Sequence, residues 1–340
     1  MKIVFVHFGK QLPKHLKLNI SRCLELFPSN QIVLITNEEC RTGNFRKLEV
    51  YRYRGGSAWH EIHTTLTHPK DFRQNFWFTS IARFLALEKY MEDNSAELIH
   101  LESDVILASD FPFDDFKKIK CSFAFPIVSP TQGIASTLYL SNLEAAQTLA
   151  NFSLEQVKKD SRATDMTILR NFYDEFPERV QVLPIGPLDR NCYRTFLDDS
   201  LFLQMGMSSQ LLGGIFDGAD IGYYVYGIDP RNAKGIKILR KSIETNFLNV
   251  PKIDLRYSKT RNFLDAWDSN LNTLVPIFSL HLHSKNPKLF SPSKSLKFLK
   301  SGLLAYLEPE SWNFVPNIFL RALFIALSRR IKLLHRGLRR

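Results

Sequence analysis

Residues 2–37 read KIVFVHFGKQLPKHLKLNISRCLELFPSNQIVLITN, and this stretch decides the fold class. Its two ends, residues 2–8 and 31–37, are apolar and rich in β-branched residues, as buried strands are. Residues 12–28, between them, are compatible with a helix. A strand, a crossover of helix length and a second strand predict a parallel sheet with ligand groups at the carboxyl ends of its strands. We therefore expect an α/β fold whose site lies where these strands end.

The first strand ends at His7 and Gly9, which makes both residues candidates for binding a nucleotide. A loop that cradles phosphates through its backbone usually reads GxGxxG or GxxxxGKS/T, and the sequence contains neither motif. The sequence therefore argues against a Rossmann dehydrogenase and against a P-loop enzyme.

Residues 98–107, LIHLESDVIL, form an apolar run that is interrupted by two carboxylates, Glu102 and Asp104. Residues two apart on a strand face the same side, so both acids should point the same way. Burying two acids together is costly unless a positive charge lies between them. A divalent cation that carries a diphosphate would supply that charge. The alternative is a strand end in solvent where both acids are hydrated.

Residues 76–93, before this strand, have apolar residues at helical spacing and predict an amphipathic helix. Arg83 lies among these apolar residues. Because the helix leads directly into residues 98–107, Arg83 could reach a phosphate or nucleotide held there. An exposed surface arginine is the ordinary alternative. The preceding residues, 51–75, are polar and aromatic and predict no clear element.

Two acids later in the chain are further candidates. Asp165 lies near the start of a predicted helix over residues 161–176, where it could equally complement the helix N-terminus. Asp217 lies in residues 212–232, which are dense in glycine. Glycine density marks close backbone approach or positive φ, commonly beside a ligand, although turn chemistry would also explain it.

Residues 274–285, LVPIFSLHLHSK, predict a late strand that carries His281 and His283 on one face, with Lys285 two residues further on. Alternating histidines on a strand can be structural. Two imidazoles and an ammonium group this close together are also a compact set of groups for a metal and a phosphate.

The net charge of +11 is unevenly distributed along the 340 residues. Residues 285–340 contain twelve Lys or Arg and two Glu, so the remainder of the chain is nearly neutral. A nucleic-acid-binding protein usually carries its basic residues through the folded domain together with readout elements, which we do not find. We therefore expect no nucleic acid partner, and a basic terminus indicates anionic lipid or another acidic surface.

Residues 317–340, NIFLRALFIALSRRIKLLHRGLRR, contain seven Lys or Arg and no acid. Their longest uncharged run, residues 322–328, is much shorter than the roughly 20 residues that a spanning helix needs. We expect a basic amphipathic helix that lies on an anionic membrane surface, and the alternative is a last core helix that packs on the body of the protein.

The four cysteines are far apart and form no CxxC pair, which argues against a zinc site or a disulfide framework and favours reduced thiols. The first ten residues, MKIVFVHFGK, contain too short an apolar segment for a signal peptide. With a basic C-terminal segment, these features predict a cytoplasmic protein that is peripheral on the inner face of the plasma membrane.

In their order along residues 1 to about 290, these features resemble nucleotide-sugar glycosyltransferases of the GT-A fold. The matching pieces are the βαβ start, a helix with Arg83 and Phe84, the DxD-type motif HLESDVIL, the acid in Thr164-Asp165-Met166 and the late histidine with its lysine. FDGADIGYYVYGIDPRN, residues 216–232, also looks like a stretch in bacterial capsule or cell-surface polysaccharide glycosyltransferases. The resemblance implies a Rossmann-like mixed, mainly parallel sheet flanked by helices.

The resemblance also implies a role for each matched residue. Asp104 would ligate Mn²⁺ or Mg²⁺, and Glu102, which replaces the family's first Asp, would contact the metal or the ribose. His283, preferred over His281, resembles the third metal ligand, and Lys285 the partner of the donor diphosphate. The residues expected to bind the nucleotide-sugar are His7, Gly9, Arg83, Glu102, Ser103 and Lys285.

A catalytic base is expected only for one stereochemical outcome. An inverting enzyme needs a carboxylate beside the acceptor hydroxyl, and Asp165 and Asp217 are the candidates, whereas a retaining enzyme would lack a dedicated base. Oxygen ligands suit Mg²⁺ or Mn²⁺, and an imidazole among them favours Mn²⁺.

The sequence as a whole predicts a metal-dependent, hexosyltransferase-like enzyme that moves a sugar from a nucleotide-sugar to a glycan or lipid-linked acceptor in surface polysaccharide synthesis. A single catalytic domain over residues 1–300 would contain a nucleotide-binding half, about 1–108, and an acceptor half, about 109–290, followed by a basic amphipathic extension over 301–340. The alternative is a non-catalytic protein of the same fold that binds a membrane or a partner.

Overall fold

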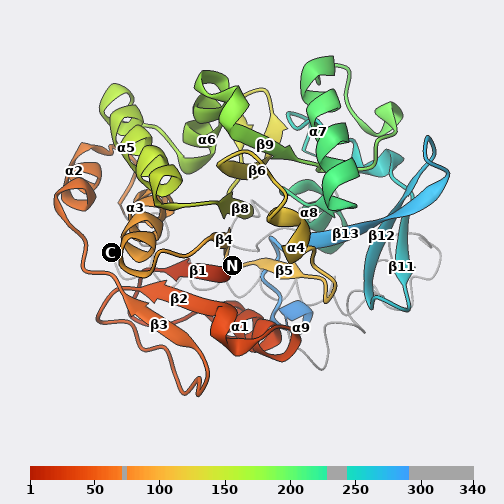
Figure 1. Ribbon diagram of the computed structural model, residues 1–340. Coiled ribbons are helices and arrows are strands. Elements are labelled where there is room, and N and C mark those ends of the chain that lie inside the picture. The colour runs from red at the N-terminus through yellow and green to blue at the C-terminus, as the bar shows by residue number, and fades with distance from the viewer. Residues whose placement is uncertain (71–74, 228–242, 291–340) are drawn as a thin grey trace, which may run out of the picture.

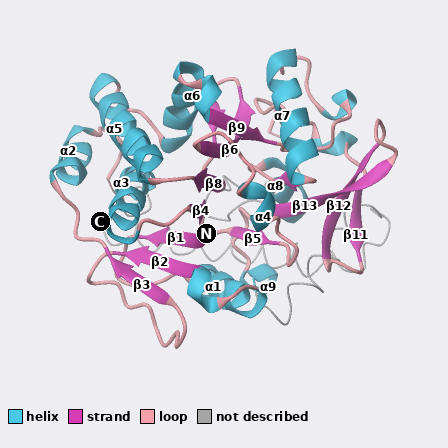
Figure 2. Cartoon of the chain, in the orientation of Figure 1, coloured by secondary structure: helices cyan, strands magenta, loops and turns pink. Residues whose placement is uncertain are grey.

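The protein is described here by a computed structural model, which covers residues 1–70, 75–227 and 243–290. Its described residues form two sheets with helices packed around them (Figure 1). Figure 2 shows helices and strands interleaved along most of the chain. The predicted α/β fold class is confirmed, with a mixed, mainly parallel central sheet flanked by helices. The predicted basic helix over residues 301–340 lies outside the described residues.

The first sheet has the strand order β3-β2-β1-β4-β8-β6-β7, and β9 also pairs with β6. Its strands are β1 (Lys2–His7), β2 (Ile32–Thr36), β3 (Glu49–Arg52), β4 (Leu98–Leu101), β6 (Phe123–Ser129), β7 (Gln132–Gly133), β8 (Thr137–Leu140) and β9 (Val180–Leu183). β1 is parallel to β2 and β4, β2 to β3, and β6 to β9. β8 runs antiparallel to both β4 and β6, so one reversed strand joins two parallel groups.

Helices cover both faces of this sheet, which is why its strands are apolar on both sides. Ile3 and Phe5 of β1 belong to the core that includes Leu16 of α1 (Lys14–Leu26). Val4, between them, belongs to the core that includes Phe84 of α3 (Phe76–Asn94). The face of α3 also holds α2 (Ser57–Thr65), α5 (Leu143–Lys159) and α6 (Asp165–Glu175). The helix α2 is an element that the sequence did not predict.

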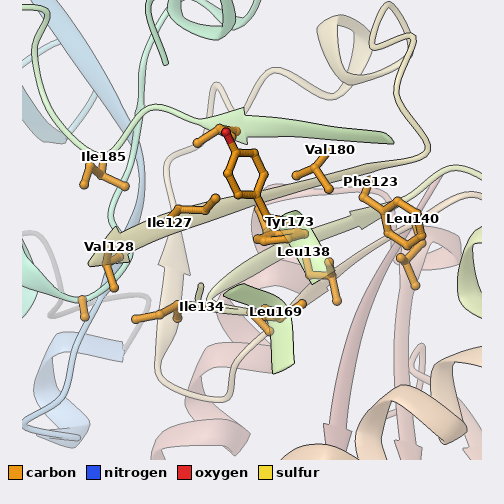
Figure 3. Packing of buried hydrophobic residues seen from close by; sticks show 14 of the residues in the cluster. Phe123, Ile127, Val128, Ile134, Leu138, Leu140, Leu169, Tyr173, Val180 and Ile185 are labelled. Atoms are coloured by element: carbon orange, nitrogen blue, oxygen red, sulfur yellow. The ribbon is translucent and has the colours of Figure 1, made fainter. Parts of the chain in front are cut away.

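The same apolar core continues where α6 packs on β6, β8 and β9. Figure 3 shows side chains of β6, β8 and β9 gathered around Leu169 and Tyr173 of α6. Burial of each large apolar side chain there contributes roughly 1.5–3 kcal/mol to stability. This packing fixes the start of α6 relative to the sheet, and therefore the position of Asp165.

The second sheet has the order β10-β13-β12-β11, and β5 pairs with β13. Its strands are β5 (Val105–Leu107), β10 (Ile215–Phe216), β11 (Leu255–Ser258), β12 (Phe263–Asp268) and β13 (Thr273–His281). The remaining α-helices are α4 (Phe113–Phe116), α7 (Asp199–Leu212), α8 (Asp220–Tyr226) and α9 (Pro287–Phe290), and short 3-10 helices lie over Ser29–Gln31, Pro177–Arg179, Arg190–Cys192 and Val250–Lys252.

The stretch 98–107, expected as one strand, is two strands separated by a turn at residues 102–104. The turn is closed by the Val105 N–H, which donates to the Glu102 carbonyl oxygen at 3.1 Å. β4 pairs with β1 and β8 in the first sheet, whereas β5 pairs with β13 in the second. The chain therefore passes from one sheet to the other across the two carboxylates.

The cysteines and the helix lengths can each be compared with what the composition predicted. All four cysteines are free thiols. Within residues 1–70, 75–227 and 243–290, none of the helices is both long enough and apolar enough to cross a bilayer.

Candidate metal and phosphate site

The turn at residues 102–104 lies beside the end of β13. His281, the last residue of β13, is paired with Val105 of β5 in antiparallel register. The Leu282 N–H then donates to the Asp104 carbonyl oxygen at 2.7 Å. Strand pairing therefore brings the end of β13, which is distant in sequence, against the acidic turn.

Glu102, Asp104 and His281 form a group in which one ligand atom of each residue lies within 4.8 Å of the others. His281 Nε2 is 3.5 Å from Glu102 Oε2 and 3.4 Å from Asp104 Oδ1. Asp104 is 6% exposed and His281 is 5% exposed, so the group is largely shielded from solvent. Two carboxylate oxygens and one imidazole nitrogen at these separations fit a divalent cation.

The orientation of the His281 ring favours metal binding through Nε2. Its other nitrogen, Nδ1, is 2.6 Å from the Gly218 carbonyl oxygen, which can only accept a hydrogen bond. Nδ1 is therefore the donor, and Nε2 faces the two carboxylates. Such a contact to a backbone carbonyl fixes the tautomer and orientation of a metal-ligating histidine.

The charges of the group are strongly coupled. Burial lowers the pKa of His281, but the Asp104 and Glu102 carboxylates outweigh it and raise this pKa to about 9. Burial raises the pKa of Asp104, but Lys285 and His281 outweigh it and hold this pKa well below its usual range. At neutral pH the metal-free group therefore holds a proton on His281, which a bound metal would displace.

Lys285 lies on the Asp104 side of this group. Its Nζ is 3.2 Å from Asp104 Oδ2, and its backbone has a left-handed φ of 48°. The Lys285 N–H donates to the Leu282 carbonyl oxygen at 3.0 Å, so a tight turn after β13 fixes this position. An ammonium group beside a metal-binding carboxylate is well placed to contact a phosphate.

Arg83 lies on the opposite side, against Glu102. Its Nη1 donates to Glu102 Oε1 at 2.7 Å, and its Nη2 donates to Asp165 Oδ2. Arg83 is 7% exposed. The sequence linked Arg83 to the acidic motif as a possible phosphate contact, and the structure brings the two together as a buried ion pair.

Asp165 is the first residue of α6, but it does not cap that helix. The cap is Thr164, whose side chain accepts from the Thr167 N–H at 3.1 Å in a capping box. The Asp165 carboxylate points to Arg83 instead. Burial raises the pKa of Asp165, and Arg83 partly offsets this. Asp165 therefore contacts Glu102 only through Arg83.

Asp217 joins α8 to the end of β13. Its Oδ1 accepts from the Ile221 N–H at 3.0 Å, and its Oδ2 accepts from the N–H groups of Gly222 at 2.8 Å and His281 at 3.0 Å. Asp217 is 0% exposed, and burial raises its pKa. A Cβ on Gly222 would lie 1.9 Å from the His281 carbonyl oxygen, so only glycine fits here. Because its carboxylate accepts from the His281 N–H, Asp217 fixes the backbone of His281.

His283, which the sequence ranked ahead of His281, is not in the metal-binding group. β13 ends at His281 and the His283 N–H donates back to the His281 carbonyl oxygen at 3.2 Å, so the two residues do not share a strand face. The two rings are stacked instead, with centroids 4.1 Å apart. Burial and the neighbouring His281 lower the pKa of His283 to about 3. Of the two rings, His281 is the one whose Nε2 lies against both carboxylates, and which ring would ligate a metal stays a prediction.

The remaining predicted residues lie at or just after the ends of β1 and β4. The Gly9 N–H donates to Asn37 Oδ1 at 2.9 Å, and His7 Nε2 is 3.1 Å from the Gln11 carbonyl oxygen. Ser103 lies at the centre of the acidic turn, with its Oγ 3.2 Å from His15 Nε2.

Two residues of α1 support the turn and were missed from the sequence. His15 contacts the Ser103 side chain, and Asn19 Nδ2 donates to the Val105 carbonyl oxygen at 2.7 Å. Their spacing of four places both residues on one face of α1. That spacing is the only signal that pointed to them, and it does not say what the face contacts.

A scan against protein-family models and a search of curated proteins both find no match for this chain. Solved structures do match. One is the galactosyltransferase LgtC in complex with donor and acceptor sugar analogs, with a TM-score of 0.42 and 16% identity over 60% of this chain and 82% of that chain. Another is mouse xyloside xylosyltransferase 1 in its apo form, with a TM-score of 0.39 and 12% identity over 54% of this chain and 84% of that chain.

A glycosyltransferase involved in glycosylation of the major capsid of PBCV-1 also matches, with a TM-score of 0.33 and 9% identity over 54% of this chain and 82% of that chain. The chain is similar in fold to solved glycosyltransferases. These likenesses are distant, so any statement on function has to rest on the residues of the site.

Proposed function

We propose that this protein is a metal-dependent glycosyltransferase that uses a nucleotide-sugar donor. One observation carries the proposal: Glu102, Asp104 and His281 face one another where the two sheets meet, and Lys285 contacts Asp104 from the outer side. A cation site with an adjacent ammonium group suits a diphosphate, which brings at least two negative charges to one place.

The chemistry follows from the charge that develops as a sugar–phosphate bond breaks. A bound Mn²⁺ or Mg²⁺ would supply Lewis-acid stabilisation of the leaving diphosphate. Asp104, His281 and Glu102 would hold the cation, and the imidazole favours Mn²⁺ over Mg²⁺. Lys285 would contact a diphosphate oxygen and stabilise the charge that grows there in the transition state.

Arg83 would then keep Glu102 oriented toward the cation. The ion pair with Arg83 occupies Glu102 Oε1 and leaves Oε2 toward His281. Asp165 and Asp217 are the candidates for a base, but their burial and their partners favour positioning roles. Asp165 would hold Arg83, and Asp217 would hold the backbone of His281.

The donor and acceptor are assigned to different halves of the domain. Residues 1 to about 108 would bind the nucleotide, since His7, Gly9 and Ser103 lie near the carboxyl ends of β1 and β4. Residues from about 109 to 290 would bind a glycan or lipid-linked acceptor of surface polysaccharide synthesis. We propose a cytoplasmic enzyme whose segment 317–340 attaches it to the inner face of the plasma membrane.

The test is a panel of nucleotide-sugars, each measured for thermal stabilisation of the protein with and without Mn²⁺. One donor should raise Tm only when Mn²⁺ is present, and that donor should be turned over in the presence of glycan acceptors. Asp104→Asn should remove the metal-dependent shift. If no donor raises Tm in either condition, or if Asp104→Asn changes nothing, a non-catalytic protein of the same fold becomes the better account.

A further inference from the structure

A second charged region lies outside the metal-binding group. The loop after β1, the first turn of α1 and the loop after β2 surround an open hollow that is lined in part by four basic side chains and one acid, and His7 and Gly9 of the proposed donor site lie at its edge. The four basic residues, named here the α1 basic patch, are Lys10, Lys14, Lys17 and Arg41. The acid is Glu39.

The side chains of the α1 basic patch have no acidic partner within the described parts of the chain. Basic side chains elsewhere are commonly paired, as Lys2 is with Glu49 at 2.8 Å and Lys89 with Glu92 at 2.7 Å. Like charges held together repel one another, which is unfavourable unless an external anion is present. The patch is therefore suited to an anionic partner.

Two residues of the patch, Lys14 and Lys17, lie in the first turn of α1, where basic side chains destabilise a helix. α1 begins at Lys14 with no acid in its first turn and no side-chain cap. Lysines at the positive end of a helix dipole reduce helix stability. A role outside the helix would account for Lys14 and Lys17 at these positions.

The basic C-terminal part of the sequence begins on the same side of the molecule. α9 packs against α1, with the rings of His15 and Phe290 5.6 Å apart, and Figure 1 shows the two helices side by side. The sequence after Phe290 contains ten Lys or Arg and two Glu. The chain thus enters its most basic segment next to the α1 basic patch.

We propose that the α1 basic patch is a contact surface for an anionic lipid bilayer. Lys10, Lys14 and Arg41 are exposed, so their charges are accessible to a negatively charged lipid surface. The inference rests on the proposed function in one respect. A bilayer held at the patch would bring a lipid-linked acceptor near the acidic turn at residues 102–104, because His15 of α1 contacts Ser103 in that turn.

The test uses the full chain and co-sedimentation with vesicles of phosphatidylglycerol and phosphatidylcholine, compared with vesicles of phosphatidylcholine alone. Lys14→Glu/Lys17→Glu should reduce binding to the anionic vesicles by at least about 25-fold, since each Lys or Arg near such a surface contributes about fivefold. The loss should shrink as salt is added. Glutamates in the first turn of α1 suit the helix dipole, so the variant should fold and keep its Tm.

A matched control is Lys120→Glu/Lys259→Glu, which changes the net charge equally at two exposed lysines on other elements. The control should lose much less vesicle binding than the α1 variant. Equal losses in the two variants, or wild-type binding by the α1 variant, would overturn the proposal. It would also be overturned if the α1 variant kept vesicle binding but lost Mn²⁺-dependent stabilisation by nucleoside diphosphates, because the hollow would then belong to the donor site.

Discussion

The two carboxylates of the acidic turn are held from opposite sides by different kinds of partner. Glu102 is paired with Arg83, which is buried against the first sheet and is itself held by Asp165. Asp104 faces His281, the last residue of β13 in the second sheet, and Lys285, which lies in the turn after that strand. The Arg83 side chain is 9% exposed and the Lys285 side chain is 20% exposed.

This difference suggests a division between a fixed and an exchangeable half of the site. Arg83 cannot leave Glu102 without leaving buried charge unpaired, which is strongly unfavourable. On the proposed function, Lys285 would move from Asp104 to a phosphate and His281 would exchange its proton for a metal, with less change in the surrounding structure. Glu102 would therefore shape the site, and Asp104 would take the larger share of binding.

The largest expected effect separates the two acids directly. Asp104→Asn should lower the metal-dependent transfer rate by about a thousandfold or more, because it removes the carboxylate that would hold the metal and that pairs with Lys285. Glu102→Gln should cost about 10–100-fold, since Arg83 still holds the side chain in place. Rates measured at saturating Mn²⁺ check this order, and a larger loss for Glu102→Gln would reverse the proposed division.

The next largest expected effect is on the stability of the protein, and it compares the loss of Arg83 with the loss of Lys285. Arg83→Met should lower the free energy of unfolding by about 3–5 kcal/mol, because it leaves Asp165 as an unpaired buried carboxylate and removes one of the two cationic partners of Glu102. Lys285→Met should lower the same quantity by less, because Lys285 is more exposed than Arg83 and the protonated His281 still pairs with Asp104. Urea unfolding of both variants measures the difference. Equal effects would mean that the two halves of the site are equally fixed.

The pH dependence of metal binding tests the exchangeable half. The pKa of His281 is raised to about 9, so the ring is protonated below that pH and Mn²⁺ must displace the proton. The apparent affinity for Mn²⁺ should therefore rise by about tenfold per pH unit from neutral pH until about pH 9. Calorimetric titrations over this range measure the slope. A His281→Gln variant that kept the full slope would show that another group releases the proton.

The smallest expected effect separates the two histidines. His283→Asn should change the affinity for Mn²⁺ by less than about threefold, because the His283 ring stacks on His281 and lies outside the group of Glu102, Asp104 and His281, whereas His281→Asn should lower it by at least about tenfold. Titration at pH 9, where the proton no longer competes strongly, gives the clearest comparison. A greater loss with His283→Asn would restore the order that the sequence suggested.

Much of the fold could be read from local patterns in the sequence. The strands and helix in residues 2–37 and the helix around Arg83 follow from apolar spacing alone, and the structure confirms them as β1, α1, β2 and α3. The helix α2 could not be read in the same way, because residues 51–75 are polar and aromatic without clear periodicity. The break in the strand at residues 98–107 was also missed, since neighbours in two different sheets cause it.

For the site, the sequence by itself determined which residue types are present and how they are spaced: an acid pair at Glu102 and Asp104, and a histidine pair before Lys285. Only the tertiary structure decided which of them meet. The choice of His281 over His283 depends on where β13 ends, and the Arg83–Asp165 pair depends on the packing of α6 against α3. Contacts between residues distant in the sequence depend on strand register and helix packing, and local spacing does not encode either.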